Sequence, residues 1–390
     1  MSRRRALAVP AVLALAAACA DPPATVFHQS PPERLSEWGL VLAEGERLVM
    51  NERVLPYDLN TALFSDYAEK LRTVWMPEGR AARYRETGDW EFPTGTILTK
   101  TFYYRDHPAA GPGAVRAAAS GQTFDGTALA LAGVRLVETR LLVKQAAGWE
   151  AYPYVWNEAQ SEAVLRRVGD LVPLTLVADG GTGRPFTYVV PDANQCAGCH
   201  RPDHGSRQLR PLGPKTRNLN AVGRDRPAAP GGGDQLAAWT QAGYLTGAPP
   251  AAAAPRLPRW DDRGDAALEA RARAYLDVNC GHCHNPAGAA DTSGLFLDID
   301  TTEPRRLGRC KPPIAAGGGS GNRLYSIVPG DPDASILVYR METSDPGEAM
   351  PELGRAVVHE EGVALVRAWI AGMHGDCRGA LAGQGDEKTL

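Results

Sequence analysis

Two pentapeptides carry the residues with the clearest chemistry in this chain. They read Cys196-Ala197-Gly198-Cys199-His200 (the first motif) and Cys280-Gly281-His282-Cys283-His284 (the second motif). Residues three apart on a helical turn point the same way, so two thiols in this spacing can bond to the two vinyl groups of one porphyrin. The next histidine can then place its imidazole under the iron. The spacing predicts two covalent haems c, held by Cys196, Cys199 and His200 and by Cys280, Cys283 and His284.

Two other chemistries use the same residue types. Four cysteines and two histidines can hold zinc, as in zinc ribbons, and a Cys-x-x-Cys pair can be a thioredoxin-type redox centre. A histidine directly after each of the two pairs favours haem attachment over both alternatives. His282 lies inside the second motif. We expect its side chain to face away from the iron and to lie at the surface.

An iron that carries electrons usually has a second axial ligand. For the haem of the second motif we expect Met350, which lies in a loop rich in glycine and proline; Met341 is the nearest alternative. The predicted iron ligands are therefore His200, His284 and Met350. For the haem of the first motif, His204 is too close in sequence to reach over the ring. The open alternatives are Met76, His107, Met341, His359 and His374.

Three of the seven cysteines lie outside the motifs. Cys310 and Cys377 lie toward the C-terminus, and an oxidising compartment favours a disulfide between them over two free thiols. The third, Cys19, belongs to the N-terminal segment.

The N-terminus has the features of a bacterial export signal. Arginines at 3–5 precede an apolar run, residues 6–18, that is too short to span a bilayer. Cys19 follows small residues, as at a lipoprotein cleavage site. Ala16 stands where leucine is usual, which leaves plain secretion open. We expect an exported protein that is periplasmic or anchored to a membrane, facing the periplasm, by a lipid on Cys19.

The elements that must position the motifs differ on the two sides of residue 190. Before it, β-branched and aromatic residues predict strands, and short helices are expected at 63–70 and 158–168. No metal or catalytic constellation is evident there. The five clearest strand stretches are 96–104, 134–143, 152–156, 171–177 and 186–190.

After residue 190 the chain reads as loops and helices. Helices are expected at 235–243, 265–279 and 360–373, the last two packed across each other, and the Pro-rich stretch 247–258 is typical of a connector. The predicted fold class is α+β, an N-terminal β-rich domain followed by a mainly α-helical cytochrome c-type haem region. Its predicted parts are a signal peptide (1–19), a β-rich domain (20–190), a first haem-binding segment with linker (191–258) and a cytochrome c-like domain with the second haem (259–380).

The composition and net charge limit the classes of partner that this chain can bind. The chain has 390 residues, of which 44% are hydrophobic and 22% charged, as in ordinary globular proteins. Its formal net charge of −3 provides no basic field, so no nucleic-acid partner is expected. Residues 215–220 carry two cations and two amides that could bind haem propionates or simply face solvent.

Beyond its motifs, the chain resembles a bacterial family of exported dihaem c-type cytochromes. The resemblance implies haem binding, electron transfer with redox partner proteins, and a C-terminal class I cytochrome c-like domain in which Met350 occupies the position of the methionine ligand. It assigns no mechanism to the β-rich domain. The similar stretches are 63–67, 100–102, 138–142, 154–157, 194–195, 213–220, 315–317 and 349–354.

Three functions are compatible with these features. The leading expectation is an electron carrier or an electron-transfer subunit, such as the electron-accepting subunit of a dehydrogenase. A haem enzyme such as a dihaem peroxidase needs one iron with an open site and acid/base groups beside it. In a binding module, the β-rich domain would recognise a carbohydrate or a protein. No sequence feature points to a specific ligand of that kind.

Overall fold

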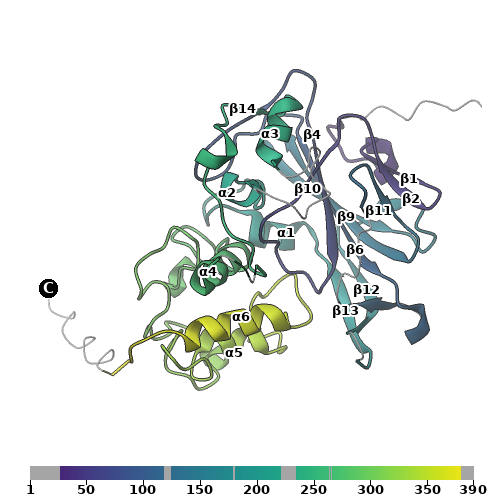
Figure 1. The fold of residues 1–390 in the computed structure, drawn as a ribbon. Helices are drawn as coiled ribbons and strands as arrows, with labels where there is room; N and C mark the ends of the chain where they lie inside the picture. The colour runs from purple at the N-terminus through teal and green to yellow at the C-terminus, as the bar shows by residue number, and fades with distance from the viewer. Residues whose placement is uncertain are drawn as a thin grey trace, which may run out of the picture.

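The computed structural model describes residues 27–117, 124–178, 181–220, 234–262, 264 and 266–378. Within these ranges the chain is rich in sheet, with 14 strands in four sheets and six α-helices. Figure 1 shows the strands gathered on one side of the molecule and α4, α5 and α6 on the other. The predicted signal peptide and Cys19 lie outside the described residues.

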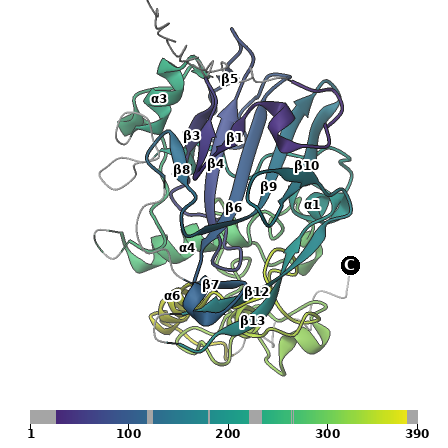
Figure 2. The same cartoon turned by 90° about the vertical axis from the view of Figure 1, so that its right-hand side faces the viewer.

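The largest sheet has six antiparallel strands in the order β11-β10-β9-β6-β4-β3 (Figure 2). Its long central strands are dense in β-branched and aromatic residues, which suit a pleated surface buried on both sides. Trp38 and Tyr154 are fully buried on one face, where the indole donates to the tyrosine hydroxyl at 2.7 Å. The strands are β3 (Leu55–Tyr57), β4 (Glu69–Trp75), β6 (Ile97–Arg105), β9 (Val134–Gln145), β10 (Gly148–Trp156) and β11 (Ala163–Leu165).

Three smaller sheets surround it. The first contains β1 (Val41–Glu44), β2 (Arg47–Met50) and β8 (Ala128–Ala130). The second contains β7 (Ala114–Arg116), β12 (Asp170–Val177) and β13 (Arg184–Val190), and the third pairs β5 (Ala82–Arg83) with β14 (Leu245–Thr246). Short 3-10 helices complete the structure: η1 (Leu35–Trp38), η2 (Pro108–Ala110), η3 (Ala251–Ala253), η4 (Asp291–Ser293) and η5 (Gly317–Ser320).

The segment that begins with the first motif shares a core with the sheet. It contains α1 (Ala193–His200), α2 (Thr216–Leu219) and α3 (Gln235–Gln241). Leu236 and Trp239 of α3 are buried against Met76 and Trp90. The parallel pairing of β14 with β5 adds a backbone connection between this segment and the sheet region.

All five predicted strand stretches are strands, but the two predicted short helices in this region are wrong. Residues 63–68 form turns, in which Asp66 and Tyr67 have positive φ. Residues 158–162 also form a turn, and β11 then pairs with β10. Positive φ is incompatible with a right-handed helix, and strand pairing outweighs local helix propensity.

The expected mainly α-helical haem region is also wrong. Three α-helices, α4 (Leu268–Asn279), α5 (Ile336–Glu342) and α6 (Glu360–Ala371), do pack around one apolar core. Between α4 and α5, however, the described chain contains only turns, loops and two 3-10 helices. Proline disfavours helix interiors strongly, and it recurs through this stretch at Pro286, Pro304, Pro312, Pro313, Pro329 and Pro332.

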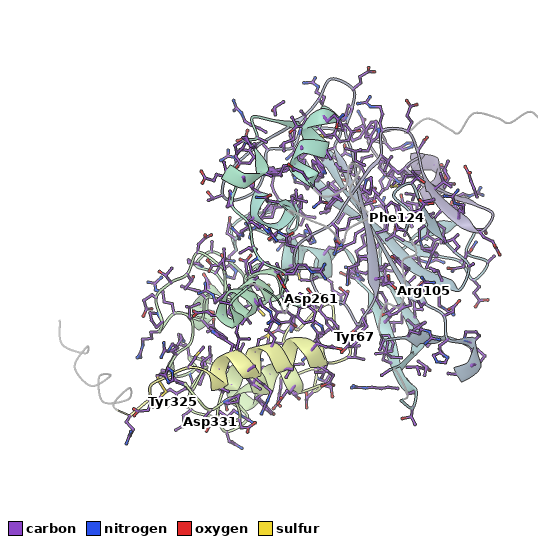
Figure 3. All side chains as sticks on the ribbon, in the orientation of Figure 1. Tyr67, Arg105, Phe124, Asp261, Tyr325 and Asp331 are labelled. Carbon is purple, nitrogen blue, oxygen red and sulfur yellow. A yellow bond between two sulfur atoms is a disulfide. The ribbon has the colours of Figure 1, made fainter. Side chains whose placement is uncertain are left out.

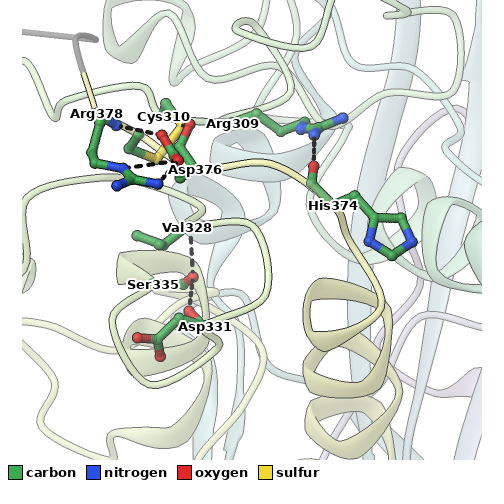
Figure 4. The surroundings of a disulfide bond; sticks show 9 residues. Arg309, Cys310, Val328, Asp331, Ser335, His374, Asp376 and Arg378 are labelled. Carbon is green, nitrogen blue, oxygen red and sulfur yellow. Dashed lines mark hydrogen bonds and ion pairs between the residues drawn. A yellow bond between two sulfur atoms is a disulfide. The ribbon is translucent and has the colours of Figure 1, made fainter.

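A disulfide joins Cys310 to Cys377, 67 residues apart (Figure 4). Nearby, Arg309 donates from Nη2 to the carbonyl oxygen of His374 at 2.7 Å. These two contacts attach the chain after α6 to the long loop before α5.

The sheet region and the helices also meet directly. The Tyr67 hydroxyl donates to Glu361 of α6 at 2.7 Å and accepts from the Glu360 backbone amide at 3.1 Å. Asp66 accepts from the amides of Ala356 and Val357 at 2.6 and 2.9 Å. Figure 3 shows Tyr67 between the sheet and the start of α6. A continuous helix over residues 63–70, as predicted, could not place Asp66 and Tyr67 in these contacts.

Candidate functional site

The first motif lies in a short helix that begins directly after β13. Asp192 caps α1, because its Oδ1 accepts from the amides of Asn194 and Gln195 at 2.7 and 2.9 Å. The Gln195 side chain accepts in return from the Asp192 amide at 3.0 Å, which completes a capping box. The cap fixes the start of the helix at the end of the strand, and thereby positions Cys196 and Cys199 on one turn.

The second motif is built differently, at the end of a helix. Cys280 is the C-cap of α4, and its amide donates to Leu276 O at 2.8 Å. The His284 amide then donates to Cys280 O at 2.9 Å. Gly281 is required for close approach, since a Cβ there would lie 2.7 Å from the Asp277 carbonyl oxygen.

The histidines of the two motifs make the same hydrogen bond. Nδ1 of His200 lies 2.7 Å from the Arg210 carbonyl oxygen, and Nδ1 of His284 lies 3.1 Å from that of Leu295. A carbonyl oxygen only accepts, so Nδ1 carries the proton and the Nε2 lone pair is available. Histidines that bind metals are usually oriented by this kind of bond.

Burial keeps both imidazoles neutral. Loss of solvent lowers the pKa of His200 to about 4, and it lowers the pKa of His284 in the same direction. Burial likewise raises the pKa of Cys280 to about 12 and raises that of Cys196. Neutral imidazole is the form that ligates iron.

The two motifs touch. Sγ of Cys283 lies 3.9 Å from the Gly198 carbonyl oxygen, and hydrogen bonds with Cys283 and His282 lower the pKa of Cys199. His204 adds a contact of 3.0 Å between its Nε2 and Asp291 Oδ1. Segments that are 84 residues apart at their first cysteines, Cys196 and Cys280, thus form one site.

A cavity of about 550 Å³ opens at the first motif. Its volume lies in the range of small-molecule and cofactor sites. Cys196, Cys199 and His200 line one part of it, and the sheet supplies another part. The volume and the lining are therefore compatible with a porphyrin attached at the first motif. His282 also lines the cavity and its Nδ1 is buried, which differs from the predicted surface position.

The sheet side chains in this cavity were missed by the sequence reading, which found no constellation there. They include Arg72, Lys100, Arg140 and Tyr188. The sequence does contain an indication of this wall. Lys100 and Arg140 are charged residues within apolar strand stretches, at positions that a buried sheet would fill with apolar residues.

The polar residues of segment 215–220, which forms α2 and its caps, face different partners. Lys215 and Arg217 line the cavity but already face carboxylates, Lys215 with Asp89 at 3.5 Å and Arg217 with Asp277 at 3.1 Å. Asn220 is buried, and its amide donates to backbone carbonyls of residues 251 and 254. Its side chain therefore joins the end of α2 to residues 251–254 and does not face the cavity.

The predicted sixth ligand, Met350, lies in the loop after α5. Its amide donates to Arg340 O at 2.8 Å, and the Arg340 charge is close enough to His284 to lower that histidine's pKa. The alternative Met341 is buried in the core between α4, α5 and α6. None of the alternatives considered for the first iron is among the described residues that line the cavity: Met76, His107, His204, Met341, His359 and His374.

The described residues contain no cluster of three or more His, Cys, Asp or Glu side chains arranged to hold a bare metal ion. Among them, no helix has the length and apolar character needed to cross a membrane. No protein-family model, curated protein or solved structure matches the chain.

Proposed function

We propose that this chain is a dihaem c-type cytochrome that transfers electrons outside the cytoplasm. One observation carries the proposal: both Cys-x-x-Cys-His motifs orient their histidine by an Nδ1 bond to a backbone carbonyl, 10 and 11 residues downstream. Zinc knuckles would need the cysteines and histidines of a motif to converge on one ion, and no such cluster exists among the described residues.

Each residue has a distinct proposed role. Cys196 and Cys199 form thioethers at the first motif, and Cys280 and Cys283 form them at the second. His200 and His284 offer Nε2 to iron. Bound haem would supply one-electron exchange between ferric and ferrous iron. The chain's own contribution is to orient the imidazoles, exclude water by burial and keep the two attachment points in contact.

Met350 is proposed as the sixth ligand at the second motif. Its loop is hydrogen-bonded to Arg340, whose charge acts on His284, whereas Met341 is a core residue. A thioether ligand raises the reduction potential relative to a second histidine. We also propose export to the periplasm, with a lipid on Cys19 as the membrane tether and a redox protein as the partner.

A second function is favoured by a specific feature of the first motif. Among its lining residues are charged and hydroxyl groups beside apolar ones, and no methionine among the described residues lines it. A haem enzyme, for example a dihaem peroxidase, would use such a site if one iron lacked a protein ligand. The electron-accepting subunit of a dehydrogenase would not need an iron that lacks a protein ligand.

Spectroscopy of the purified protein separates these functions. A carrier should show six-coordinate irons at both motifs and no rapid reaction with carbon monoxide or peroxide. Rapid binding of carbon monoxide by one of two haems, together with peroxide turnover, would instead support the enzyme. A protein without covalent haem would exclude both.

A further inference from the structure

Three cations lie side by side on the sheet wall of the cavity. In the strand register, Arg72 of β4 is opposite Lys100 of β6, and Lys100 is opposite Arg140 of β9. Figure 2 shows these three strands as neighbours. All three side chains line the cavity that also contains Cys196, Cys199 and His200. Like charges directly opposite one another destabilise a sheet unless anions accompany them.

The two arginines have their anions within the protein. Arg72 Nη1 lies 2.9 Å from Asp58 Oδ1. Arg140 donates from Nε to Glu138 Oε2 at 2.8 Å, and the same buried carboxylate accepts from the Tyr188 hydroxyl at 2.7 Å. Two positive charges of the row are therefore balanced by two carboxylates.

Lys100 differs from both arginines. Among the described residues it has no hydrogen bond and no ion pair, and its Nζ lies 4.9 Å from the centre of the Phe102 ring. Burial and the charges of Arg140 and Arg72 lower the pKa of Lys100 to about 7. The other cations of the wall have oxygen partners, as Arg210 and Lys215 have in Asp89, each at 3.5 Å.

We propose that Arg72, Lys100 and Arg140 form a binding site for a carboxylate-type oxyanion in the cavity at the first motif, with Lys100 as its principal contact. The anion would complete the balance of charge across the row, since a partly buried cation without a counter-charge is costly. The arginines, already held by carboxylates, would orient the anion from either side.

Two sources can supply such an oxyanion. One is a propionate of the haem at the first motif, in which case the inference rests on the proposed function. The other is a small free oxyanion that enters the cavity as a ligand or substrate. The chemistry recognised is the same, and an experiment on the holoprotein can separate the sources.

The experiment compares wild type with Lys100→Met, Lys100→Arg and Lys144→Met. Lys144 is a matched control, since it lies on β9 over the ring of Trp149 and does not line the cavity. Lys100→Gln is made as well, in case methionine impairs folding. The haem content of each protein is first measured by intact-mass spectrometry. Absence of haem would contradict the proposed function, and this step detects it independently of the anion test. Acetate is then titrated at constant ionic strength, and both haem potentials are measured.

For a free oxyanion, acetate should give a saturable spectral change in wild type, with an affinity about tenfold weaker in Lys100→Met, the loss of about one charged contact. For a propionate, acetate should have no saturable effect. Lys100→Met should then lower the potential of one haem only, because removing a positive charge favours ferric iron. In both cases Lys100→Arg should stay near wild type. The proposal is overturned if Lys100→Met, Lys100→Gln and Lys144→Met all match wild type in both measurements.

Discussion

The two motifs have the same pattern of side chains but lie in different surroundings. The first is inside a capped helix that faces a sheet wall with Arg72, Lys100 and Arg140. The second follows the end of α4, and Cys280 contacts the apolar core formed with α5 and α6. The histidine hydrogen bond is common to both. The comparison teaches that, in the proposed function, the pentapeptide would determine attachment, while the surrounding chain would determine what each haem is exposed to.

The largest expected effect comes from removing the attachment residues of one motif. Cys196→Ser with Cys199→Ser should leave one haem per chain, bound at the second motif, because thioether formation needs the local thiols only. Cys280→Ser with Cys283→Ser should leave one haem per chain, bound at the first motif. Intact mass and the absorbance of the denatured protein give the haem count. Loss of both haems from either double variant would show that the sites do not act independently.

The next prediction concerns Met350, the proposed axial ligand at the second site. Met350→Ala should keep that haem attached, open its iron to carbon monoxide and lower its potential, because the thioether ligand is lost. Met341→Leu is the matched control and should change neither property, since Met341 is a core residue. Near-infrared spectra of the ferric protein detect the sulfur-to-iron band. A band that persists in Met350→Ala would make Met350 a packing residue.

The charged wall of the first site should be a source of stability. Glu138→Gln leaves Arg140 without its counter-charge and should destabilise the holoprotein by about 3–5 kcal/mol. The 25% exposure of the Arg140 side chain places the expected value in the lower part of that range. Asp125→Asn removes an exposed ion pair with Arg47 and should cost clearly less, because solvent screens that pair. Urea unfolding measures both, and equal losses would contradict a special role for the buried pair.

His359, at the start of α6, should make the stability of the protein depend on pH. This side chain is stacked on Phe64 and accepts or donates a hydrogen bond with the Tyr275 hydroxyl at 3.0 Å. Burial lowers its folded-state pKa to about 4, below the unfolded value of 6.5. The unfolded chain therefore binds the proton first, so stability falls as pH drops from about 6.5 to about 4, by at most about 3 kcal/mol. His359→Phe should flatten that part of the unfolding profile, and an unchanged slope would show that other groups control it.

The smallest predicted effect concerns the helix that carries the first motif. Asp192→Ala removes the cap of α1 and should cost about 1 kcal/mol. Asp234→Ala removes the corresponding cap of α3, where Oδ1 accepts from the Ala237 amide at 2.9 Å. Both should lower global stability similarly. Only Asp192→Ala should speed amide hydrogen exchange at residues 194–200, and equal exchange there in the two variants would contradict a positioning role for Asp192.

Local patterns predicted what depends on local residues. The strand pattern of residues 134–143 specifies β9, and the residue types of the two motifs are enough to propose a chemistry without any knowledge of the fold. The turn at Asp66 and Tyr67 was mispredicted as helix because its conformation depends on contacts with residues 356–361, nearly 300 positions away. The same limit applies to the site, where Lys100 meets the first motif only through the register of β4, β6 and β9.

The contact between the two motifs could not be predicted from the sequence either. Cys283 lies against Gly198 because α1 and the end of α4 are brought together by tertiary packing, which no spacing in the chain encodes. The mainly helical expectation after residue 259 relied on two real helices, α4 and α6, and overlooked both the proline-rich stretch between them and the short helix α5.

The most direct test is the intact mass of the protein purified after export with its haem-attachment machinery. The covalent attachment of one haem at each motif predicts the mass of the processed chain plus two haems, retained after denaturation. It also predicts loss of one haem mass in each motif variant. A wild-type mass equal to the bare chain, or to the chain with zinc, would contradict the proposed function.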